Sequence, residues 1–288
     1  MKLAIGTAQF GMKYGISNVS GKVSQEKGKE IIKYAASSGI DIIDTAIAYG
    51  DSEAVLGDIG VKAFKVITKL PEVPDYIVDI EGWVINAVKD SISRLGVESL
   101  YGLLLHRPGQ LLGPKSHKIL PALRLLKDLG LVKNLGISVS SPIEFEALFN
   151  ICDFDIVQCP FNLIDRRLVE TGWLKKLKSL DVEVHSRSSF LQGLLLMKID
   201  DIPLKFSNWG NTWKKWDDWQ KENCSSALEG CLSFINSFKD IDRVVVGVDS
   251  AKQLGQIIES FKVRTFQNYP EISSYSEELI SPVNWEKL

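Results

Sequence analysis

Eight short apolar runs alternate with longer segments of helical periodicity, and this alternation constrains the fold more than any other feature of the chain. The runs are rich in Val, Ile and Leu, and several are apolar at consecutive positions. Strands of a parallel sheet that is buried on both faces have this pattern. The expected strands are residues 3–7, 40–44, 65–69, 100–106, 132–138, 156–158, 182–185 and 243–247.

The segments between these runs predict amphipathic helices with recognisable N-caps. Ser24, Asp51 or Ser52, Ser140–Ser141 and Ser250 are suitable capping residues. Eight strands alternating with helices in a chain of 288 residues predict a (β/α)8 TIM barrel, formed as a single domain over residues 1–288. A doubly wound open sheet is the alternative, but the G-x-G-x-x-G motif that normally follows its first strand is absent. The expected helices are residues 79–95, 118–128, 142–149, 167–180 and 251–260, with two more beginning near Ser24 and Ser52.

Two segments depart from the repeating pattern. Residues 193–212 form a long loop after the seventh expected strand, and in a barrel every loop after a strand lies on the catalytic face. We therefore expect this insertion over the mouth of the barrel. The C-terminal tail, residues 264–288, is too polar and irregular to form another barrel unit.

Composition excludes several classes of partner. The chain has 34 basic and 36 acidic residues, so its net charge of −2 argues against nucleic acid as a partner. The longest apolar stretches, residues 102–105 and 244–248, are too short to span a membrane, and the N-terminus lacks a signal-peptide pattern. Four scattered cysteines form no C-x-x-C pair, so neither a metal site nor a disulfide framework is indicated. These features predict a reduced cytoplasmic protein.

Titratable side chains gather where the expected strands end. Asp44 closes the second strand, Lys69 the third and His106 the fourth, and Tyr49 follows Asp44 by five residues. The carboxyl ends of barrel strands meet at one mouth, so we expect these four side chains to converge there. Each alone also fits a cap, a surface position or a turn, but together they indicate a catalytic site.

These residues lie in motifs that resemble the aldo-keto reductases. The resemblance rests on D-T-A-x-x-Y-G at residues 44–50, Thr68-Lys69, and Leu-Leu-His ending at His106. Further matching segments follow in the same order as in the family along nearly the whole chain. The chain is most similar to bacterial members of the family. The further matching segments are Gly136-Ile137-Ser138, residues 158–163, residues 190–193 and residues 246–250.

The resemblance implies reduction of an aldehyde or ketone to an alcohol by NAD(P)H, and assigns a role to each of the four side chains. Tyr49 donates a proton to the carbonyl oxygen, and the Lys69 cation favours ionisation of that phenol. Asp44 holds Lys69 in place. His106 orients the carbonyl and stabilises developing charge.

The resemblance also implies a set of cofactor-binding residues. Ser138 and Gln158 match positions that bind the nicotinamide carboxamide, and Asn162 lies nearby, although Val139 stands where many members have Asn. Arg187 stands where the family commonly has a tyrosine that stacks on the cofactor. Its guanidinium can stack on an aromatic ring and also reach the pyrophosphate. Alternatively, Arg187 forms a structural ion pair with an Asp or Glu neighbour. The remaining expected contacts are Ser188, Leu191, Gly193, Gly247, Ser250, Lys252 and Gln253.

The choice of cofactor rests on the segment after the eighth strand. The family implies NADPH, whose 2′-phosphate is usually met there by Lys or Arg. Lys252 is the one basic residue in residues 248–253, and Asp249 would repel a phosphate and could accept from a free ribose hydroxyl. NADH is therefore the competing cofactor.

The substrate is less defined by the sequence. Trp209, Trp213, Trp216 and Trp219 have helical spacing, which indicates packing for Trp216 and Trp219, and Trp209 is the candidate for a pocket wall. The resemblance to bacterial members of the family implies a sugar-derived carbonyl compound as substrate, and we expect a monomer or weak homo-oligomer. Two alternatives are a non-catalytic regulatory barrel that binds a dinucleotide, and a metal-dependent barrel enzyme, which the lack of clustered carboxylates at strand ends disfavours.

Overall fold

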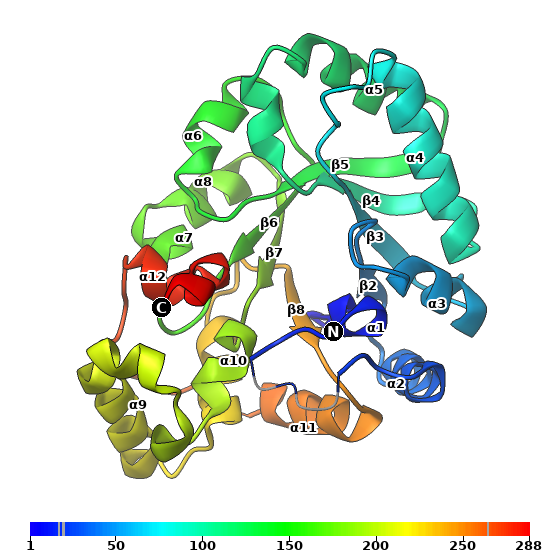
Figure 1. The fold of residues 1–288 in the computed structure, drawn as a ribbon. Helices are drawn as coiled ribbons and strands as arrows, with labels where there is room; N and C mark the ends of the chain where they lie inside the picture. Colours follow the sequence, from blue (N-terminus) through cyan, green and yellow to red (C-terminus); the bar gives the residue numbers. More distant parts are fainter. Residues whose placement is uncertain (17, 19–20, 264) are drawn as a thin grey trace.

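The chain forms a closed barrel of eight parallel strands in sequence order, so the TIM-barrel prediction is confirmed and the open-sheet alternative is wrong (Figure 1). The computed structural model describes residues 1–16, 18, 21–263 and 265–288. The first and last strands pair, with Ile5 opposite Val246. The strands are β1 (Leu3–Gly6), β2 (Ile42–Asp44), β3 (Lys65–Leu70), β4 (Leu100–Leu105), β5 (Val132–Ser138), β6 (Ile156–Pro160), β7 (Glu183–Arg187) and β8 (Arg243–Gly247).

Helices surround the strands, and several begin at the side chains expected to cap them. Ser24 accepts a hydrogen bond from Lys27 N, and Ser250 accepts one from Gln253 N. The helices are α1 (Ala8–Gly11), α2 (Gln25–Ser37), α3 (Ser52–Ile59), α4 (Ile80–Leu95), α5 (Ser116–Asp128), α6 (Glu144–Phe149), α7 (Arg167–Glu170), α8 (Trp173–Ser179), α9 (Gly210–Glu222), α10 (Ala227–Asn236), α11 (Ala251–Phe261) and α12 (Glu277–Ile280).

The expected continuous helix over residues 167–180 is instead two helices, α7 and α8. Gly172 separates them with φ of +79°, a left-handed conformation that glycine adopts without a steric penalty. The break leaves α7 as a short element beside the mouth of the barrel. This places Arg167, its first residue, in a buried position on the rim.

Two apolar layers stabilise the barrel. Most buried side chains pack between the outer faces of the strands and the surrounding helices. A smaller cluster fills the inside of the barrel, and its side chains come from five strands. Because this inner cluster fills the interior, the polar site at the mouth rests on a packed apolar layer. Its members are Ala4, Ile42, Ile67, Leu104 and Ile156.

The expected insertion after β7 is partly ordered as 3-10 turns at Leu191–Leu196, Ile199–Asp201 and Leu204–Trp209, followed by α9. Trp213, Trp216 and Trp219 of α9 are buried, and the indole of Trp216 donates to Leu195 O at 3.0 Å. The helical spacing of these tryptophans therefore reflects packing, as expected for Trp216 and Trp219.

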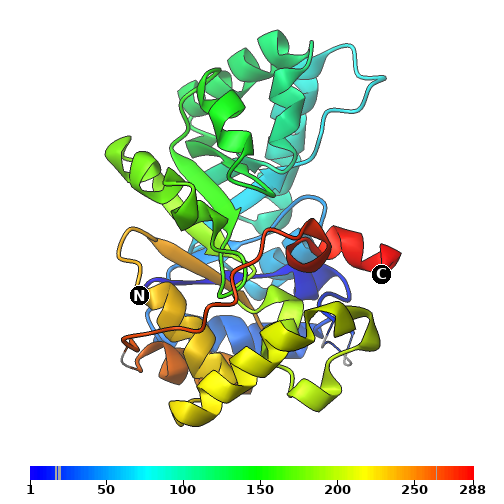
Figure 2. The same ribbon diagram turned by 90° about the vertical axis from the view of Figure 1, so that its left-hand side faces the viewer.

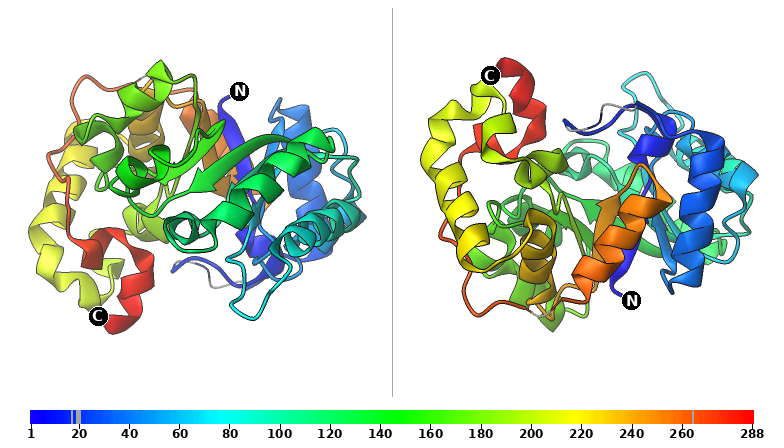
Figure 3. Two further views of the ribbon diagram at one scale, coloured as in Figure 1. Left: turned by 90° about the horizontal axis from the view of Figure 1, so that it is seen from above. Right: turned by 90° about the horizontal axis from the view of Figure 1, so that it is seen from below.

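The C-terminal tail runs back across the insertion, as Figure 2 shows. The indole of Trp219 donates to Asn268 O at 3.0 Å, and Lys205 Nζ donates to Trp285 O at 2.7 Å. In both views of Figure 3 the red tail lies beside the yellow α9. The tail carries the short α12 and a 3-10 turn at Pro282–Lys287, so it is less irregular than expected.

Candidate active site

Three strand ends bring an ion pair and an amide together at the mouth of the barrel. Lys69 Nζ of β3 lies 2.6 Å from Asp44 Oδ1 of β2 and also donates to Thr45 O at 2.9 Å. The other carboxylate oxygen of Asp44 accepts from Gln158 Nε2 of β6 at 2.7 Å, across the barrel. The convergence expected from the positions of Asp44 and Lys69 is therefore present in the structure.

The Lys69–Asp44 pair is almost completely removed from water, with side-chain exposures of 1% and 4%. Burial alone would lower the pKa of Lys69, but the Asp44 carboxylate more than compensates and raises the pKa above its ordinary value. Lys69 is therefore a fixed cation over the physiological pH range. Its ammonium lies 5.1 Å from the centre of the Tyr49 ring.

Two glycines hold the loop that carries Tyr49. A Cβ on Gly11 would lie 1.6 Å from the Tyr49 carbonyl oxygen, so no other residue fits at that position. Gly50 has φ of +56° and approaches the Gly11 backbone in the same way. This close contact of α1 with the loop after β2 fixes Tyr49 beside Lys69.

His106 lies beside Tyr49 and completes the expected group of four. The two rings are in an edge-to-face arrangement with centroids 5.7 Å apart. Burial, together with the nearby charges of Lys69 and Arg107, lowers the pKa of His106 to about 4. A neutral imidazole can donate one hydrogen bond to a carbonyl oxygen without carrying charge.

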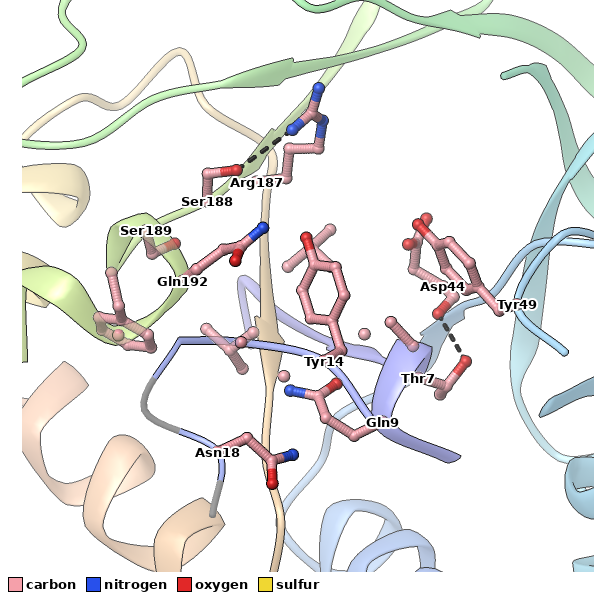
Figure 4. Close-up of a pocket in the computed structure, with 18 of the residues that line it drawn as sticks. Thr7, Gln9, Tyr14, Asn18, Asp44, Tyr49, Arg187, Ser188, Ser189 and Gln192 are labelled. Carbon is pink, nitrogen blue, oxygen red and sulfur yellow. Dashed lines mark hydrogen bonds between the residues drawn. The ribbon is translucent and has the colours of Figure 1, made fainter. Parts of the chain in front are cut away.

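A cavity of about 570 Å³ extends from these residues to the start of α11. Figure 4 shows Asp44 and Tyr49 on one wall, Arg187, Ser188 and Gln192 on another, and Tyr14 standing between them. Ten of the residues singled out from the sequence line this cavity. They are Asp44, Tyr49, His106, Ser138, Gln158, Arg187, Ser188, Gly193, Gly247 and Gln253.

Trp209 and five other residues singled out from the sequence lie outside the cavity lining. Lys69 and Asn162 contact residues that line the cavity: Lys69 Nζ donates to Asp44 Oδ1, and Asn162 Nδ2 donates to Ser188 O at 3.0 Å. Leu191 is buried in the apolar core, Ser250 caps α11, and Lys252 is exposed.

Trp209 does not form a wall of this cavity, so the structure does not support its expected place in the substrate pocket. It is half-buried, and its ring packs near Phe206 with centroids 6.3 Å apart. It immediately precedes α9, so its side chain contributes to the packing of the insertion instead.

Arg187 projects from the end of β7 toward the cavity. Its guanidinium donates to Val139 O at 3.0 Å and to Ser188 Oγ at 3.2 Å. Among the described residues no carboxylate pairs with it, so the structural ion pair considered as an alternative is not formed there. The remaining N–H groups of the guanidinium are available to an anionic ligand.

The sequence did not single out the contribution of the first strand to the cavity. Thr7, Gln9, Tyr14 and Asn18 line it, although no catalytic motif marks them. Gln9 lies against Gly247, where an added Cβ would come within 2.3 Å of the Gln9 amide. Their position at the end of the first expected strand and in the segment after it is the one signal that could have identified them.

The far end of the cavity, at the start of α11, lacks a cation among its described lining residues. Asp249 lines it, and the Asp249 backbone N–H donates to Gln253 Oε1 at 2.7 Å. Partial burial raises the pKa of Asp249. Lys27 of α2 is the cation that acts on this carboxylate, and it does not line the cavity.

The chain belongs to the aldo/keto reductase family, whose sequence model matches residues 2–272. The oxidoreductase sirO of Leptosphaeria maculans is 28% identical over 204 residues, which cover 67% of this chain and 61% of sirO. D-arabinose 1-dehydrogenase of Saccharomyces cerevisiae is 33% identical over 129 residues, covering 41% of this chain and 37% of that protein. The alignments therefore span less than two thirds of these relatives.

The same fold occurs in a solved structure of the aldo-keto reductase AKR11C1 from Bacillus halodurans in its holo form. The TM-score is 0.75, with 19% identity over 92% of this chain and 88% of that chain. At 19% identity this likeness shows the fold alone. Within the described residues, no helix has the length and apolar character needed to cross a membrane.

Proposed function

We propose that the protein reduces an aldehyde or ketone to an alcohol with a reduced nicotinamide dinucleotide, and that Tyr49 donates the proton. The observation that carries the proposal is the buried Lys69–Asp44 pair beside the Tyr49 ring, next to a large cavity. A fixed cation near a phenol favours the charge that remains on the phenol oxygen after proton transfer. The neutral His106 can hold the carbonyl oxygen by a hydrogen bond.

The cavity has groups that suit each part of a dinucleotide. Gln158 Oε1 accepts weakly from Ser138 Oγ at 3.4 Å, so both groups can exchange this contact for the carboxamide of the nicotinamide. Arg187 and Ser188, with Gly193 in the same segment, suit the pyrophosphate, and Asn162 holds Ser188 in place. When bound, the cofactor supplies the hydride.

The charge at the far end of the cavity bears on the choice of cofactor. Family resemblance implies NADPH, whose 2′-phosphate would need a cation from the segment that contains Ser250, Lys252 and Gln253. Asp249 and Gln253 line that end instead, and Lys252 lies outside the lining. A carboxylate can accept a hydrogen bond from a free ribose hydroxyl and repels a phosphate, so NADH is the cofactor that this end favours.

A sugar-derived carbonyl compound is the substrate class we propose, in keeping with the similarity to D-arabinose 1-dehydrogenase. We further propose that residues 1–288 act as a single domain, as a cytoplasmic monomer or weak homo-oligomer.

The proposal is tested first by cofactor binding and then by turnover. We expect both reduced nucleotides to be detectable by energy transfer from tryptophan, and a panel of carbonyl compounds to be reduced with one nucleotide consumed per alcohol formed. Tight nucleotide binding with no turnover across a broad panel would instead support the non-catalytic regulatory barrel. Failure to bind either nucleotide would contradict both functions.

A further inference from the structure

A second, smaller cavity of about 230 Å³ opens beside the candidate active site. It shares His106, Arg107, Ser138 and Ser140 with the main cavity, so the two are continuous at the reacting end. The main cavity extends from Tyr49 toward α11, whereas this one extends toward the loops after β3, β4 and β5. A substrate whose carbonyl lies at His106 would therefore project the rest of its chain into the second cavity.

The lining of the second cavity is almost entirely polar. Pro108 contributes its only sizeable apolar side chain among the described residues. Charges of both signs are present, since Arg107 brings a cation and Glu72 and Glu144 bring carboxylates. The remaining lining residues are His106, Gly109, Gln110, Ser138 and Ser140.

Some of these polar groups are occupied by contacts that hold the loops together. Gln110 Oε1 accepts from Val73 N at 3.2 Å and Gln110 Nε2 donates to Arg107 O at 3.1 Å, which joins the loops after β3 and β4. Glu144 Oε1 accepts from the backbone N–H groups of Ser140 and Ser141 at 2.7 and 2.9 Å. The backbone of these loops is therefore held in position before any ligand binds.

Other polar groups have no partner among the described residues. The guanidinium of Arg107 and the carboxylate of Glu72 form neither a hydrogen bond nor an ion pair there, although both face the cavity. Glu144 Oε2 and Ser140 Oγ are also without a partner in the described chain. The cavity thus presents donors and acceptors side by side.

We propose that this second cavity, lined by Arg107, Glu72, Glu144 and Ser140, binds the hydroxyl groups of a polyhydroxylated carbonyl substrate. Hydroxyl groups donate and accept, so vicinal hydroxyls can satisfy Arg107 and the two carboxylates together. Arg107, Glu72 and Ser140 are exposed and Glu144 is half-buried. An anionic substituent would match Arg107 but be repelled by Glu72 and Glu144, and an alkyl chain would displace water from these groups without replacing its hydrogen bonds. The inference rests on the proposed carbonyl reduction, and it names the residues that select the substrate.

The first test is equilibrium binding, which does not need turnover. In the presence of saturating NAD⁺, the straight-chain polyol threitol should bind to the wild-type protein. Arg107→Met should weaken this binding about tenfold, because a hydrogen bond to a charged group is lost while an unbranched apolar stem is retained. The exposed Lys118 of α5 provides the control variant Lys118→Met, which should bind threitol like the wild type. Absence of threitol binding to the wild type, or equal binding by Arg107→Met, would overturn the proposal.

The second test compares butanal with 2,3,4-trihydroxybutanal as substrates. Arg107→Met should raise the KM for the trihydroxy compound about tenfold relative to the KM for butanal, because any effect of Arg107 on His106 or on the main cavity acts on both aldehydes alike. Equal changes for both aldehydes would show a general role of Arg107 and contradict the selection of hydroxyl groups. If neither aldehyde is reduced while threitol binds through Arg107, the proposed reduction fails but the polyol site remains.

Discussion

The Lys69 ammonium and the Asp44 carboxylate are 2.6 Å apart and are nearly inaccessible to water. Two charges in such a place are costly to desolvate, and a buried ion pair is weak evidence for a stabilising role. The pair also has a defined position, because Asp44 is held by Gln158 and Lys69 by Thr45 O. We infer that its principal effect is to fix a cation beside Tyr49.

Replacing Asp44 by Asn tests this relationship. Asp44→Asn leaves the Lys69 ammonium buried without a counter-charge, so we expect the free energy of unfolding to fall by about 3–5 kcal/mol. Denaturant unfolding followed by tryptophan fluorescence measures this change. The exposed Asp90 provides the control Asp90→Asn, which should be close to the wild type. Unchanged stability and activity in Asp44→Asn would mean that Lys69 does not depend on this carboxylate.

Removal of the Tyr49 hydroxyl tests the proposed proton donor. Tyr49→Phe keeps the ring that contacts Lys69 and His106, so we expect little change in the Kd of the reduced nucleotide. Turnover should fall by a factor of about 10²–10⁴, the usual contribution of a positioned acid. The matched control is Tyr34→Phe on the exposed side of α2, which should retain activity. Full activity of Tyr49→Phe on the same carbonyl compound would exclude Tyr49 as the donor.

The low pKa of His106 predicts a specific response to pH. The imidazole takes up a proton near pH 4 in the folded protein but near about 6.5 in an unfolded chain. The unfolded state therefore binds more protons between these values, so this residue lowers the stability of the folded protein as the pH falls from about 6.5 to about 4.

Proton NMR of the imidazole ring measures this directly, with His106→Gln used to assign the signal. We expect the His106 signal to show no titration between about pH 5.5 and 8. His106→Gln should also reduce the loss of stability on acidification. A His106 signal that titrates near neutral pH would show that the ring is not held neutral at the site.

The fold was predictable because a parallel barrel has strands buried on both faces, and these appear as apolar runs such as residues 102–105. The catalytic candidates were predictable because barrel strands end at a common mouth, so Asp44, Lys69 and His106 had to lie near one another. The distances between these side chains and their hydrogen-bond partners were not predictable in this way. Asp44 and Gln158, which are hydrogen-bonded, lie 114 positions apart in the chain.

Features that depend on side-chain direction and loop packing were the least predictable. Trp209 has the spacing of its helical neighbours, but the packing of the insertion directs it away from the main cavity. Gly11 gives no signal in the sequence, although its contact with the Tyr49 carbonyl positions the catalytic loop. The second cavity lies between the loops after β3, β4 and β5. Gln110 joins the first two of these loops, and the periodicity of the sequence does not indicate that contact.

The choice between NADH and NADPH depends on the charge at the far end of the cavity, and Asp249 dominates that charge. We expect the wild-type protein to bind NADH more tightly than NADPH, because the 2′-phosphate would face this carboxylate without a cation in the lining to compensate. Asp249→Asn should tighten NADPH binding about five- to tenfold and leave NADH within about twofold, since the site is partly exposed and the repulsion is screened. Fluorescence titrations with both nucleotides measure the four dissociation constants, for NADH and NADPH with the wild type and with Asp249→Asn.

The exposed Glu259, later in α11, provides the control Glu259→Gln, which should alter neither affinity. Tighter binding of NADPH than NADH by the wild type would show that a cation outside the lining, such as Lys27 or Lys252, reaches the phosphate and outweighs Asp249.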